Sequence, residues 1–451
     1  MLSLRLFRRA YCTSRRDSPL HVPNSEKMTN VVIPDLDLKE RLAKCENLNV
    51  NLTRRGLPEL NRNVEILSKG LDNVAHLKKQ VANVLDLREA TRLELQELKK
   101  KGPAKQEELN AKQKELEELK KEFLMLRDTT AALDKDVTLS ILDLPNAIHA
   151  SVGDQDEIVF QSPPTVGLRD FLPKPHPELA GEELEFSDNS HTAFYLFNRL
   201  AKLELDLGSK CLAFLKNLKY EAMSCPDFYK SVVLDGCAVN FRDLGSEFAL
   251  KSVKEFGNRD SGQGMHLTGG ASLYAMVSFF SKNVVRTPDR LPRSFVSLGR
   301  RYRPVPHRPE PSSLFHTQQS NAVQTFSIYA KQRESEKAYE KALLEMKTFY
   351  SKLGVPFRAV NKAAKNLAPA ESKRVSFELF SAGENDFIPV GSLSLYGKYL
   401  SNRLMIKEDR KNNLNSLFSY GGCFMDITKA IGCIVEHNQD SEGNYSTDCG
   451  L

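Results

Sequence analysis

A long heptad pattern between residues 71 and 142 constrains the fold of this chain more than any other feature. In its second half, apolar side chains occupy the a and d positions of one heptad frame, with Lys112 and Thr130 as the polar exceptions. The apolar positions are Leu109, Leu116, Leu119, Phe123, Leu126, Leu133 and Val137. The first half carries a looser stripe, interrupted between Arg88 and Arg92, of Val74, Leu77, Val81, Val84, Leu95 and Leu98. Because each stripe needs an apolar partner, the pattern predicts two antiparallel helices that cover each other.

The tripeptide Lys101-Gly102-Pro103 marks the point where the chain reverses. Gly102 tolerates the left-handed conformation that ends a helix, and Pro103 suits the first turn of the next one. At ~1.5 Å per residue, helices of about 30 to 35 residues reach ~45–50 Å. Since the outer faces are charged, the sequence predicts an arm that projects from the rest of the protein.

Basic residues surround this turn, and no acid intervenes before Glu107. They are Lys99, Lys100, Lys101 and Lys105. One interpretation is a tip that only keeps the arm soluble. The other is a finger that contacts the phosphates of a nucleic acid, since lysines bind phosphate as point charges.

The first sixteen residues account for most of the positive net charge of the chain. They contain five arginines and no acid, so the net charge of +6 falls to +1 without them. An Arg-rich, acid-free start with hydroxyl residues is typical of a mitochondrial transit peptide, although a disordered basic tail has the same composition. We therefore expect a protein of the mitochondrial matrix, where any nucleic-acid binding comes from local patches.

Other chemical motifs are weak. Eight cysteines are scattered without Cys-x-x-Cys spacing, and the histidines lack the spacing of metal ligands. The glycines of Ser261-Gly262-Gln263-Gly264 lack the lysine of a P-loop. No apolar run is long enough to span a membrane. We expect no metal site, no cofactor and no insertion into a membrane.

The composition changes after Leu144-Pro145-Asn146, where β-branched and aromatic residues become more frequent. Short strand-like segments then alternate with longer amphipathic ones, which predicts an α+β domain with a largely antiparallel sheet flanked by helices. The predicted strands are 192–197, 295–298 and 375–380, and the predicted helices are 201–218, 334–353 and 425–436.

Several motifs occur in an order that resembles the seryl-tRNA synthetases. Tyr220-Glu221-Ala222-Met223-Ser224-Cys225-Pro226-Asp227 resembles motif 1 of class II synthetases. Leu291-Pro292 followed by Arg301-Tyr302-Arg303 resembles motif 2, and Asn438-Gln439 resembles the end of these enzymes. The resemblance implies a coiled-coil arm that grips transfer RNA, a class II domain, and a dimer whose interface includes Tyr220, Cys225 and Pro226.

With this resemblance, four regions are expected along the chain. They are a transit peptide at 1–16, a linker at 17–30, a helical domain with the coiled-coil arm at 31–143, and a degenerate class II synthetase-like domain at 144–451.

The residues that serine activation needs are largely missing. Arg303 and Glu378 stand at positions that match the family. Gly270 stands at the position where the family has a Glu for the serine ammonium. Other positions where the family has Glu or Arg are occupied by Val305, Gln324, Pro389 and Lys429. Leu395 and Gly421 stand where the family has Asn. A preorganised polar contact contributes ~3 kcal/mol to a transition state, so losing several of them predicts no useful catalysis. The chain thus resembles the non-charging insect mitochondrial relatives of seryl-tRNA synthetase.

A run of arginines near motif 2 has Asp289 as its only local acid and favours a polyanion as ligand. The run is Arg286, Arg290, Arg293, Arg300, Arg301, Arg303 and Arg308. We hypothesise an inactive paralogue that binds tRNA or another mitochondrial RNA through the four lysines at the tip, assisted by Arg300, Arg301 and Arg303. It would act as a heterodimer with the mitochondrial seryl-tRNA synthetase, or as a homodimer, in support of mitochondrial translation. The alternatives are an active serine–tRNA ligase or other adenylating enzyme, a scaffold that has lost RNA, and a decayed fold without a ligand.

Overall fold

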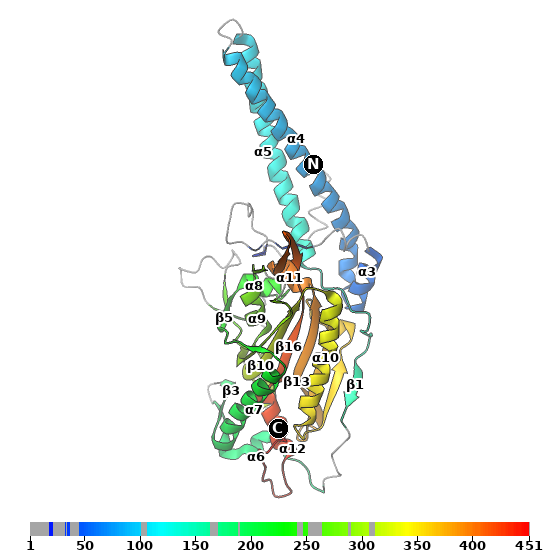
Figure 1. The fold of residues 1–451 in the computed structure, drawn as a ribbon, viewed down its shortest axis with the longest axis vertical. Helices are drawn as coiled ribbons and strands as arrows, with labels where there is room; N and C mark the ends of the chain where they lie inside the picture. The colour runs from blue at the N-terminus through cyan, green and yellow to red at the C-terminus, as the bar shows by residue number, and fades with distance from the viewer. Residues whose placement is uncertain are drawn as a thin grey trace.

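The computed structural model combines a projecting arm with an α+β body (Figure 1). It describes residues 18–20, 32, 34–36, 45–100, 106–162, 170–187, 190–240, 247–250, 264–286, 290–305 and 312–450. The predicted fold class, a coiled-coil arm followed by a mainly antiparallel sheet with flanking helices, is confirmed. The expected transit peptide and the turn of the arm at 101–105 lie outside the described residues.

The arm consists of two long helices, α4 (Asn61–Lys100) and α5 (Gln106–Leu142), preceded by α3 (Cys45–Arg54) and η2 (Pro58–Leu60). The predicted a and d positions of α5 are partly or fully buried, whereas the residues between them are largely exposed. The gap in the apolar stripe of α4 is filled by Thr91, which is buried, and by Arg88, whose guanidinium lies 5.0 Å from the centre of the Phe123 ring. The seam therefore continues through the arm without a break.

Two buried arginines join the base of the arm to the body. Arg55 donates hydrogen bonds to the carbonyl oxygens of Asn146 at 3.0 Å and Ala368 at 3.2 Å. Arg403 donates to the carbonyl oxygen of Leu142, the last residue of α5, at 3.0 Å. A charged donor that loses such partners in a buried site leaves a large desolvation penalty, so these contacts hold the arm in place.

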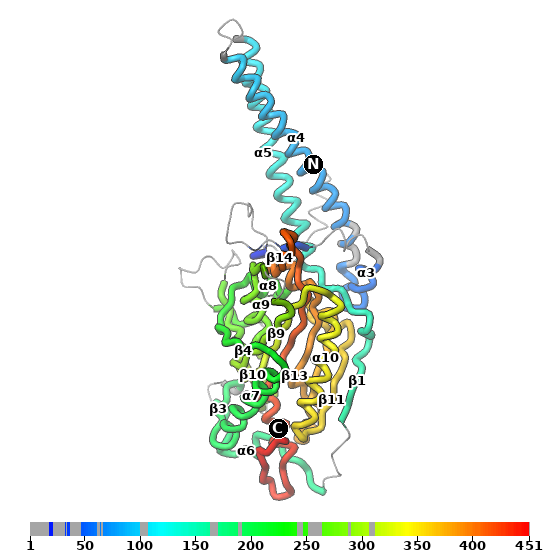
Figure 2. The backbone as a smooth tube through the Cα atoms, viewed as in Figure 1, coloured from blue at the N-terminus to red at the C-terminus, as the bar shows by residue number. Residues whose placement is uncertain are grey.

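The body is built on one large sheet, in which the pairs are antiparallel except for the edge strand β4. In spatial order the strands are β1 (Glu157–Gln161), β11 (Phe357–Asn361), β12 (Lys373–Ser381), β13 (Asp386–Gly397), β16 (Phe418–Asp426), β10 (Gln319–Tyr329), β9 (Arg293–Tyr302) and β4 (Glu221–Ala222). The helices α7 (Asn198–Asn217), α10 (Gln332–Ser351) and α12 (Ile427–His437) pack on it. Figure 2 shows α7 and α10 in front of the central strands. The apolar stripes of these helices form the main core with the sheet, as their periodicity predicts.

Smaller elements surround this sheet. One group is β5 (Phe228–Lys230), β6 (Phe248–Ala249) and β7 (Met265–Leu267), with the helices α8 (Ser231–Gly236) and α9 (Leu273–Phe280). A second group is β8 (Val284–Val285), β14 (Lys407–Arg410) and β15 (Asn413–Ser416), with α11 (Tyr399–Leu404). A third group is β2 (Leu184–Ser187) and β3 (Ser190–Leu196), with α6 (His176–Ala180) and η4 (Gly181–Glu183). The short helix η8 (Leu314–His316) contacts α12, and the Ala364 N–H of η9 (Ala364–Asn366) donates to the Gly153 carbonyl oxygen at 3.0 Å.

The described part of the expected linker at 17–30 is packed against the body. Ser18 and Leu20 are buried, and the Ser18 hydroxyl donates a hydrogen bond to the carboxylate of Asp235. Leu20 belongs to a core cluster with Leu139 of α5. At these positions the structure differs from a free linker, because an apolar side chain and a hydroxyl both find buried partners.

Candidate functional site

A pocket lies where β9, β10, β12, β13 and β16 meet the start of α12. It has a volume of about 410 Å³, within the range of small-molecule sites. The lining combines Arg301 and Arg303 of the motif 2-like segment with residues from distant strands. These are Arg301, Arg303, Val305, Phe315, His316, Thr317, Gln318, Ser320, Lys362, Arg374, Ser376, Pro389, Val390, Gly391, Ser392, Cys423, Asp426 and Lys429.

Local structure places the cations in this pocket. Arg301 lies near the end of β9, and the backbone N–H of Arg303 donates to the carbonyl oxygen of Gln318 at 2.8 Å, which ties the two chain segments together. Lys429 lies in the first turn of α12, where Asp426 is the N-cap residue and accepts a hydrogen bond from the Lys429 N–H. Arg301, Arg303 and Lys429 therefore line the same cavity.

The expected position of the serine-binding carboxylate is closed by the backbone. A Cβ atom at Gly270 would lie 2.5 Å from the carbonyl oxygen of Cys225, closer than such contacts occur. The Gly270 N–H donates to the Asp227 carboxylate at 2.7 Å. A glutamate at position 270 would require the chain around Cys225 to move. The local backbone is therefore incompatible with a carboxylate side chain at this position.

The retained Glu378 is not available as a metal ligand. Its side chain is buried, with one oxygen 2.7 Å from Arg358 Nε and the other 3.7 Å from Lys362 Nζ. The residue opposite it in the strand pair is Pro389, which has no side-chain oxygen. Among the described residues, no group of three His, Cys, Asp or Glu side chains is arranged to hold a metal ion. The magnesium ion that the resemblance implies for an ATP site does not fit these residues.

Other replaced positions have structural roles of their own. Leu395 is buried in the main core, where the side-chain amide of an Asn would have no water to hydrogen-bond with. Gln324 is also buried, and its amide donates to the carbonyl oxygen of Thr325 at 3.2 Å. A Cβ atom at Gly421 would lie 2.4 Å from the carbonyl oxygen of Thr325. The neighbouring strands thus occupy the space that the polar groups of a synthetase would need.

The cations of the pocket repel one another. The positive charge of Arg301 is the main cause that lowers the pKa of Arg303. Burial lowers the pKa of Lys429, against the opposing effect of Asp426, and both arginines add to the lowering. Burial also raises the pKa of the Cys423 thiol to about 11, so this thiol is neutral near pH 7.

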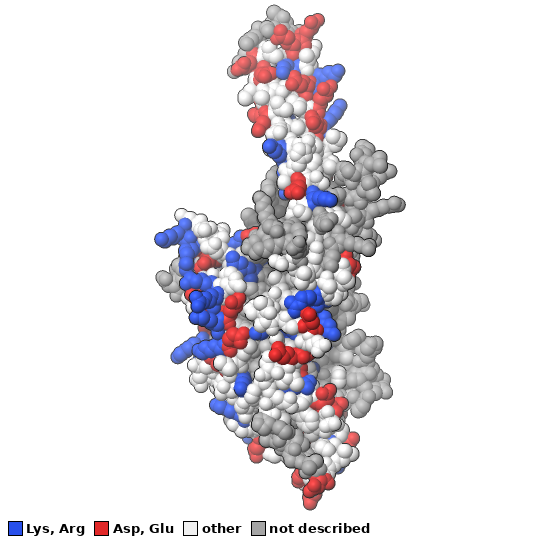
Figure 3. All heavy atoms as spheres, turned by 90° about the vertical axis from the view of Figure 1, so that its right-hand side faces the viewer, with Lys and Arg blue, Asp and Glu red and all other residues white. Residues whose placement is uncertain are grey.

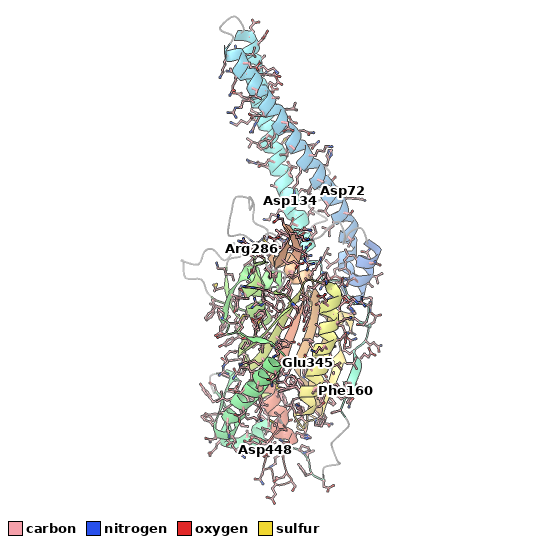
Figure 4. The ribbon with its side chains drawn as sticks, viewed as in Figure 1. Asp72, Asp134, Phe160, Arg286, Glu345 and Asp448 are labelled. Atoms are coloured by element: carbon pink, nitrogen blue, oxygen red, sulfur yellow. The ribbon has the colours of Figure 1, made fainter. Side chains whose placement is uncertain are left out.

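The arginines predicted to assist RNA binding do not form one surface. Arg301 and Arg303 line the pocket, whereas Arg300 points to the other side of β9, 3.8 Å from Glu204 of α7. Arg293 is paired with Glu221 at 2.7 Å, and Figure 4 places Arg286 near the base of the arm. The expected single patch is corrected by strand geometry, because successive side chains alternate between the two faces of a strand. Arg308 lies outside the described residues.

At the arm tip the structure describes part of the predicted lysine cluster. Lys99 is exposed on α4. Lys100 ends the same helix, while Lys101 and Lys105 lie outside the described residues. Figure 3 shows acidic and basic side chains mixed along the described length of the arm.

The motif 1-like segment is only partly exposed. Pro226 is exposed and Cys225 is half-buried. Tyr220 lies inside the main core, where burial raises its pKa to about 12, so its side chain faces its own chain instead of a partner. This corrects the expectation for Tyr220, because the ring is needed to fill the space beside Tyr420.

Lys362 and Arg374 are pocket residues that the sequence analysis missed. They lie just after β11 and within β12, which pair in the sheet. No local motif marks either residue, since the register of two strands brings them to the cavity. Knowledge of that register was the only signal that could have found them.

The comparisons agree with this architecture. Residues 269–438 match the tRNA synthetase class II core domain (G, H, P, S and T). The serine–tRNA synthetase-like protein Slimp of Drosophila melanogaster is 28% identical over 454 residues, covering 97% of this chain and 91% of that protein. The serine–tRNA ligase of Treponema denticola is 24% identical, covering 72% of this chain and 78% of that enzyme.

Among solved structures, the seryl-tRNA synthetase from Pyrococcus horikoshii complexed with ATP has the same fold. The TM-score is 0.76 at 19% identity, over 90% of this chain and 94% of that chain. In the described part of the chain, no helix is both long and apolar enough to cross a membrane. The chain is therefore similar along most of its length to seryl-tRNA synthetases and to a synthetase-like protein, and its residues 269–438 match the class II core domain.

Proposed function

We propose that this protein does not charge serine onto tRNA, but binds RNA through its arm and acts as a dimer in the mitochondrial matrix, in support of mitochondrial translation. The observation that most supports the absence of catalysis is at Gly270. There the Cys225 carbonyl occupies the space that a substrate-binding carboxylate side chain would need. The name of the Drosophila relative, a synthetase-like protein, is compatible with such a role.

The metal position supports the same proposal. Activation of an amino acid by ATP requires a high negative charge to be neutralised, for which the enzymes use metal ions and cations together. Here Glu378 is neutralised by Arg358, and Pro389 supplies no ligand. Removing several preorganised contacts, each contributing ~3 kcal/mol, makes turnover negligible even if their effects are not additive.

The RNA-binding part of the proposal rests on the arm and its tip. A projecting coiled coil with Lys99 exposed near its end can reach a phosphate backbone at a distance from the body (Figure 1). The matrix location rests on the Arg-rich, acid-free start of the sequence.

Serine-dependent exchange between ATP and pyrophosphate tests the catalytic part. We expect the purified chain to remain at background, beside an active mitochondrial seryl-tRNA synthetase as the positive control. The variant Gly270→Glu should also remain at background, because the added side chain meets the Cys225 carbonyl and the metal position is still missing. Clear exchange stimulated by serine would instead establish a serine–tRNA ligase, and exchange with another carboxylic acid would establish a different adenylating enzyme.

A further inference from the structure

Large apolar side chains are exposed midway along the arm, outside the seam that joins its two helices. Leu87 of α4 is 56% exposed and Met125 of α5 is 63% exposed. Further exposed leucines near this height are Leu85, Leu93 and Leu124. The Arg88 guanidinium of α4 lies 5.0 Å from the centre of the Phe123 ring of α5, so these parts of the two helices lie side by side. A group of exposed apolar side chains on a charged, projecting helix pair indicates a surface that a partner covers.

The heptad frame divides the arm into two flanks. In an antiparallel pair, the c and g positions of both helices lie on one side of the seam, and the b and e positions lie on the other. Lys112 of the seam contacts Glu94 of α4 at 2.8 Å and Glu115 of α5 at 2.9 Å, and both glutamates are at g positions. On the opposite flank, Lys78 and Asp134 pair at 2.9 Å, and both are at e positions. The printed ion pairs therefore agree with the frame.

One flank carries glutamates around the exposed apolar pair. We call the c and g positions from 87 to 97 and from 108 to 125 the acidic flank. These positions are Leu87, Ala90, Glu94, Glu97, Glu108, Ala111, Glu115, Glu118, Glu122 and Met125. They include six glutamates and neither Lys nor Arg. The lysines that border the flank are Lys112 in the seam, which Glu94 and Glu115 hold, and Lys114 and Lys121 at the outermost f positions.

The opposite flank has a different charge at the same height. Its exposed leucines, Leu85 and Leu124, are accompanied by Arg92, Lys120 and Arg127 at e positions. The two sides of the arm therefore attract different ligands. On the acidic flank, the glutamates repel the phosphates of a nucleic acid and the headgroups of an anionic membrane.

The combination of charge and apolar surface selects the kind of partner. Leu87 and Met125 offer a ligand apolar contact, and the glutamates beside them attract Lys and Arg. A helix with an apolar stripe between basic residues satisfies both requirements at once. We propose that the acidic flank docks a basic amphipathic helix of a partner protein, which lies along α4 and α5. This interaction goes beyond the function proposed above and leaves the lysines of the tip free.

Fluorescence anisotropy of a labelled synthetic peptide with the full chain tests this inference. The peptide has Leu at helical i, i+3, i+4 and i+7 spacing and Lys elsewhere, so it forms a basic amphipathic helix. We expect saturable binding that weakens as salt rises, because part of the attraction is between charges. The same peptide with Glu in place of Lys should not bind. A third peptide, with Ser in place of Leu, should bind about 10-fold more weakly, because it buries no apolar surface.

Variants of the flank locate the peptide on the arm. Leu87→Ser combined with Met125→Ser should weaken binding about 5- to 10-fold, since neither position then offers apolar surface for the peptide to bury. Glu118→Gln combined with Glu122→Gln should weaken binding about 3-fold and make it less sensitive to salt.

A matched control separates this flank from exposed leucines in general. Leu93 is 55% exposed, almost the same as Leu87, but it occupies an f position on the outermost line of α4. Leu93→Ser should therefore leave the affinity unchanged. All these variants should melt at the wild-type temperature, because the exchanged side chains are exposed. Changing the tip lysines to Ala should leave peptide binding intact, so failure of the RNA proposal is distinguishable from failure of this one.

Three results with the peptides would overturn the inference. They are no saturable binding of the Leu–Lys peptide, equal binding of its Glu version, and an equal loss of affinity in Leu93→Ser and Leu87→Ser. Two further results would also overturn it by assigning the flank to another occupant. Binding to phosphatidylglycerol vesicles that the Leu87 and Met125 variant loses would indicate a membrane surface, and self-association that Glu118→Lys abolishes would indicate a second copy of this chain.

Discussion

Single residues decide the chemistry of this molecule. Gly270 is the clearest case, because the Cys225 carbonyl lies where its side chain would begin. Glu378 matches a family position, but Arg358 binds its carboxylate, so this group is already paired within the chain. The described lining of the pocket is dominated by cations, with Asp426 as its one carboxylate.

Lys429 gives this pocket a measurable pH dependence. Its pKa lies below the usual 10.5, because burial disfavours the charged form and Arg301 and Arg303 repel it, while Asp426 opposes the shift. The positive charge of Lys429 should therefore fall as the pH rises through this lowered pKa. We expect this fall within the pH range below 10.5, earlier than for an unperturbed lysine.

Nuclear magnetic resonance of the chain with isotope-labelled methyl groups on its lysines measures the effect across this pH range. The Cys423 thiol, which also faces Lys429, has a pKa of about 11 and does not titrate within most of the range. Lys429→Arg keeps the charge at every pH used and should remove the signal that titrates early. An unchanged profile in that variant would assign the titration to another group.

At the scale of elements, the arm is the part that local sequence specifies most completely. The spacing of its apolar positions places Leu109 to Val137 against α4, and Lys112 in the same seam pairs with Glu94 across the hairpin at 2.8 Å. The base is held by Arg55 and Arg403 through carbonyl oxygens of the body. An arm held in this way presents its tip at a defined distance from the sheet (Figure 1).

The tip lysines provide the test of RNA binding at this scale. Changing Lys99, Lys100, Lys101 and Lys105 together to Ala should weaken binding of mitochondrial tRNA. The slope of log affinity against log salt should become shallower by about 0.7 to 0.9 for each phosphate that the variant no longer binds. Fluorescence anisotropy at several salt concentrations measures both quantities.

A second fourfold variant controls for net charge. Lys79, Lys114, Lys120 and Lys121 are exposed along the arm, away from its tip, and changing them to Ala removes the same charge. We expect this variant to bind nearly as well as the wild type. Equal losses in the two variants would mean that charge anywhere on the arm suffices, and no loss in either would leave the tip as a solubilising turn.

For the whole molecule, we propose that the chain forms a dimer through its motif 1-like segment. The segment with Cys225 and Pro226 lies at the edge of the body, and the nearby rings of Phe228 and Phe279 are 49% and 52% exposed. Exposed aromatic rings are enriched in protein interfaces, so they favour a dimer through this region. An isologous interface needs a matching patch, which a related subunit can also supply.

We predict that co-expression with the mitochondrial seryl-tRNA synthetase yields a heterodimer, in preference to a homodimer of this chain. Size-exclusion chromatography with light scattering identifies the species by mass. Phe228→Asp should reduce dimer formation, since it places a charge in the interface, whereas Leu344→Asp on α10, where the leucine is 64% exposed, should not. A stable monomer beside a separate synthetase homodimer would refute the heterodimer.

The sequence alone determined the features that depend on neighbouring residues. The arm followed from heptad spacing, because a helix repeats its contacts every few residues along the same segment. The long helix α10 followed from the same kind of pattern. The absence of a carboxylate at Gly270 and Pro389 was also visible, since a residue type is read from the sequence without coordinates.

The tertiary structure alone decided which distant residues share a site. Tyr220 matched an interface motif, but its ring fills the core beside Tyr420. The alternation of β9 separated Arg300 from Arg301, and the pairing of β11 with β12 brought Lys362 and Arg374 to the pocket. Such groupings depend on strand register and long-range packing, which no short stretch of sequence contains.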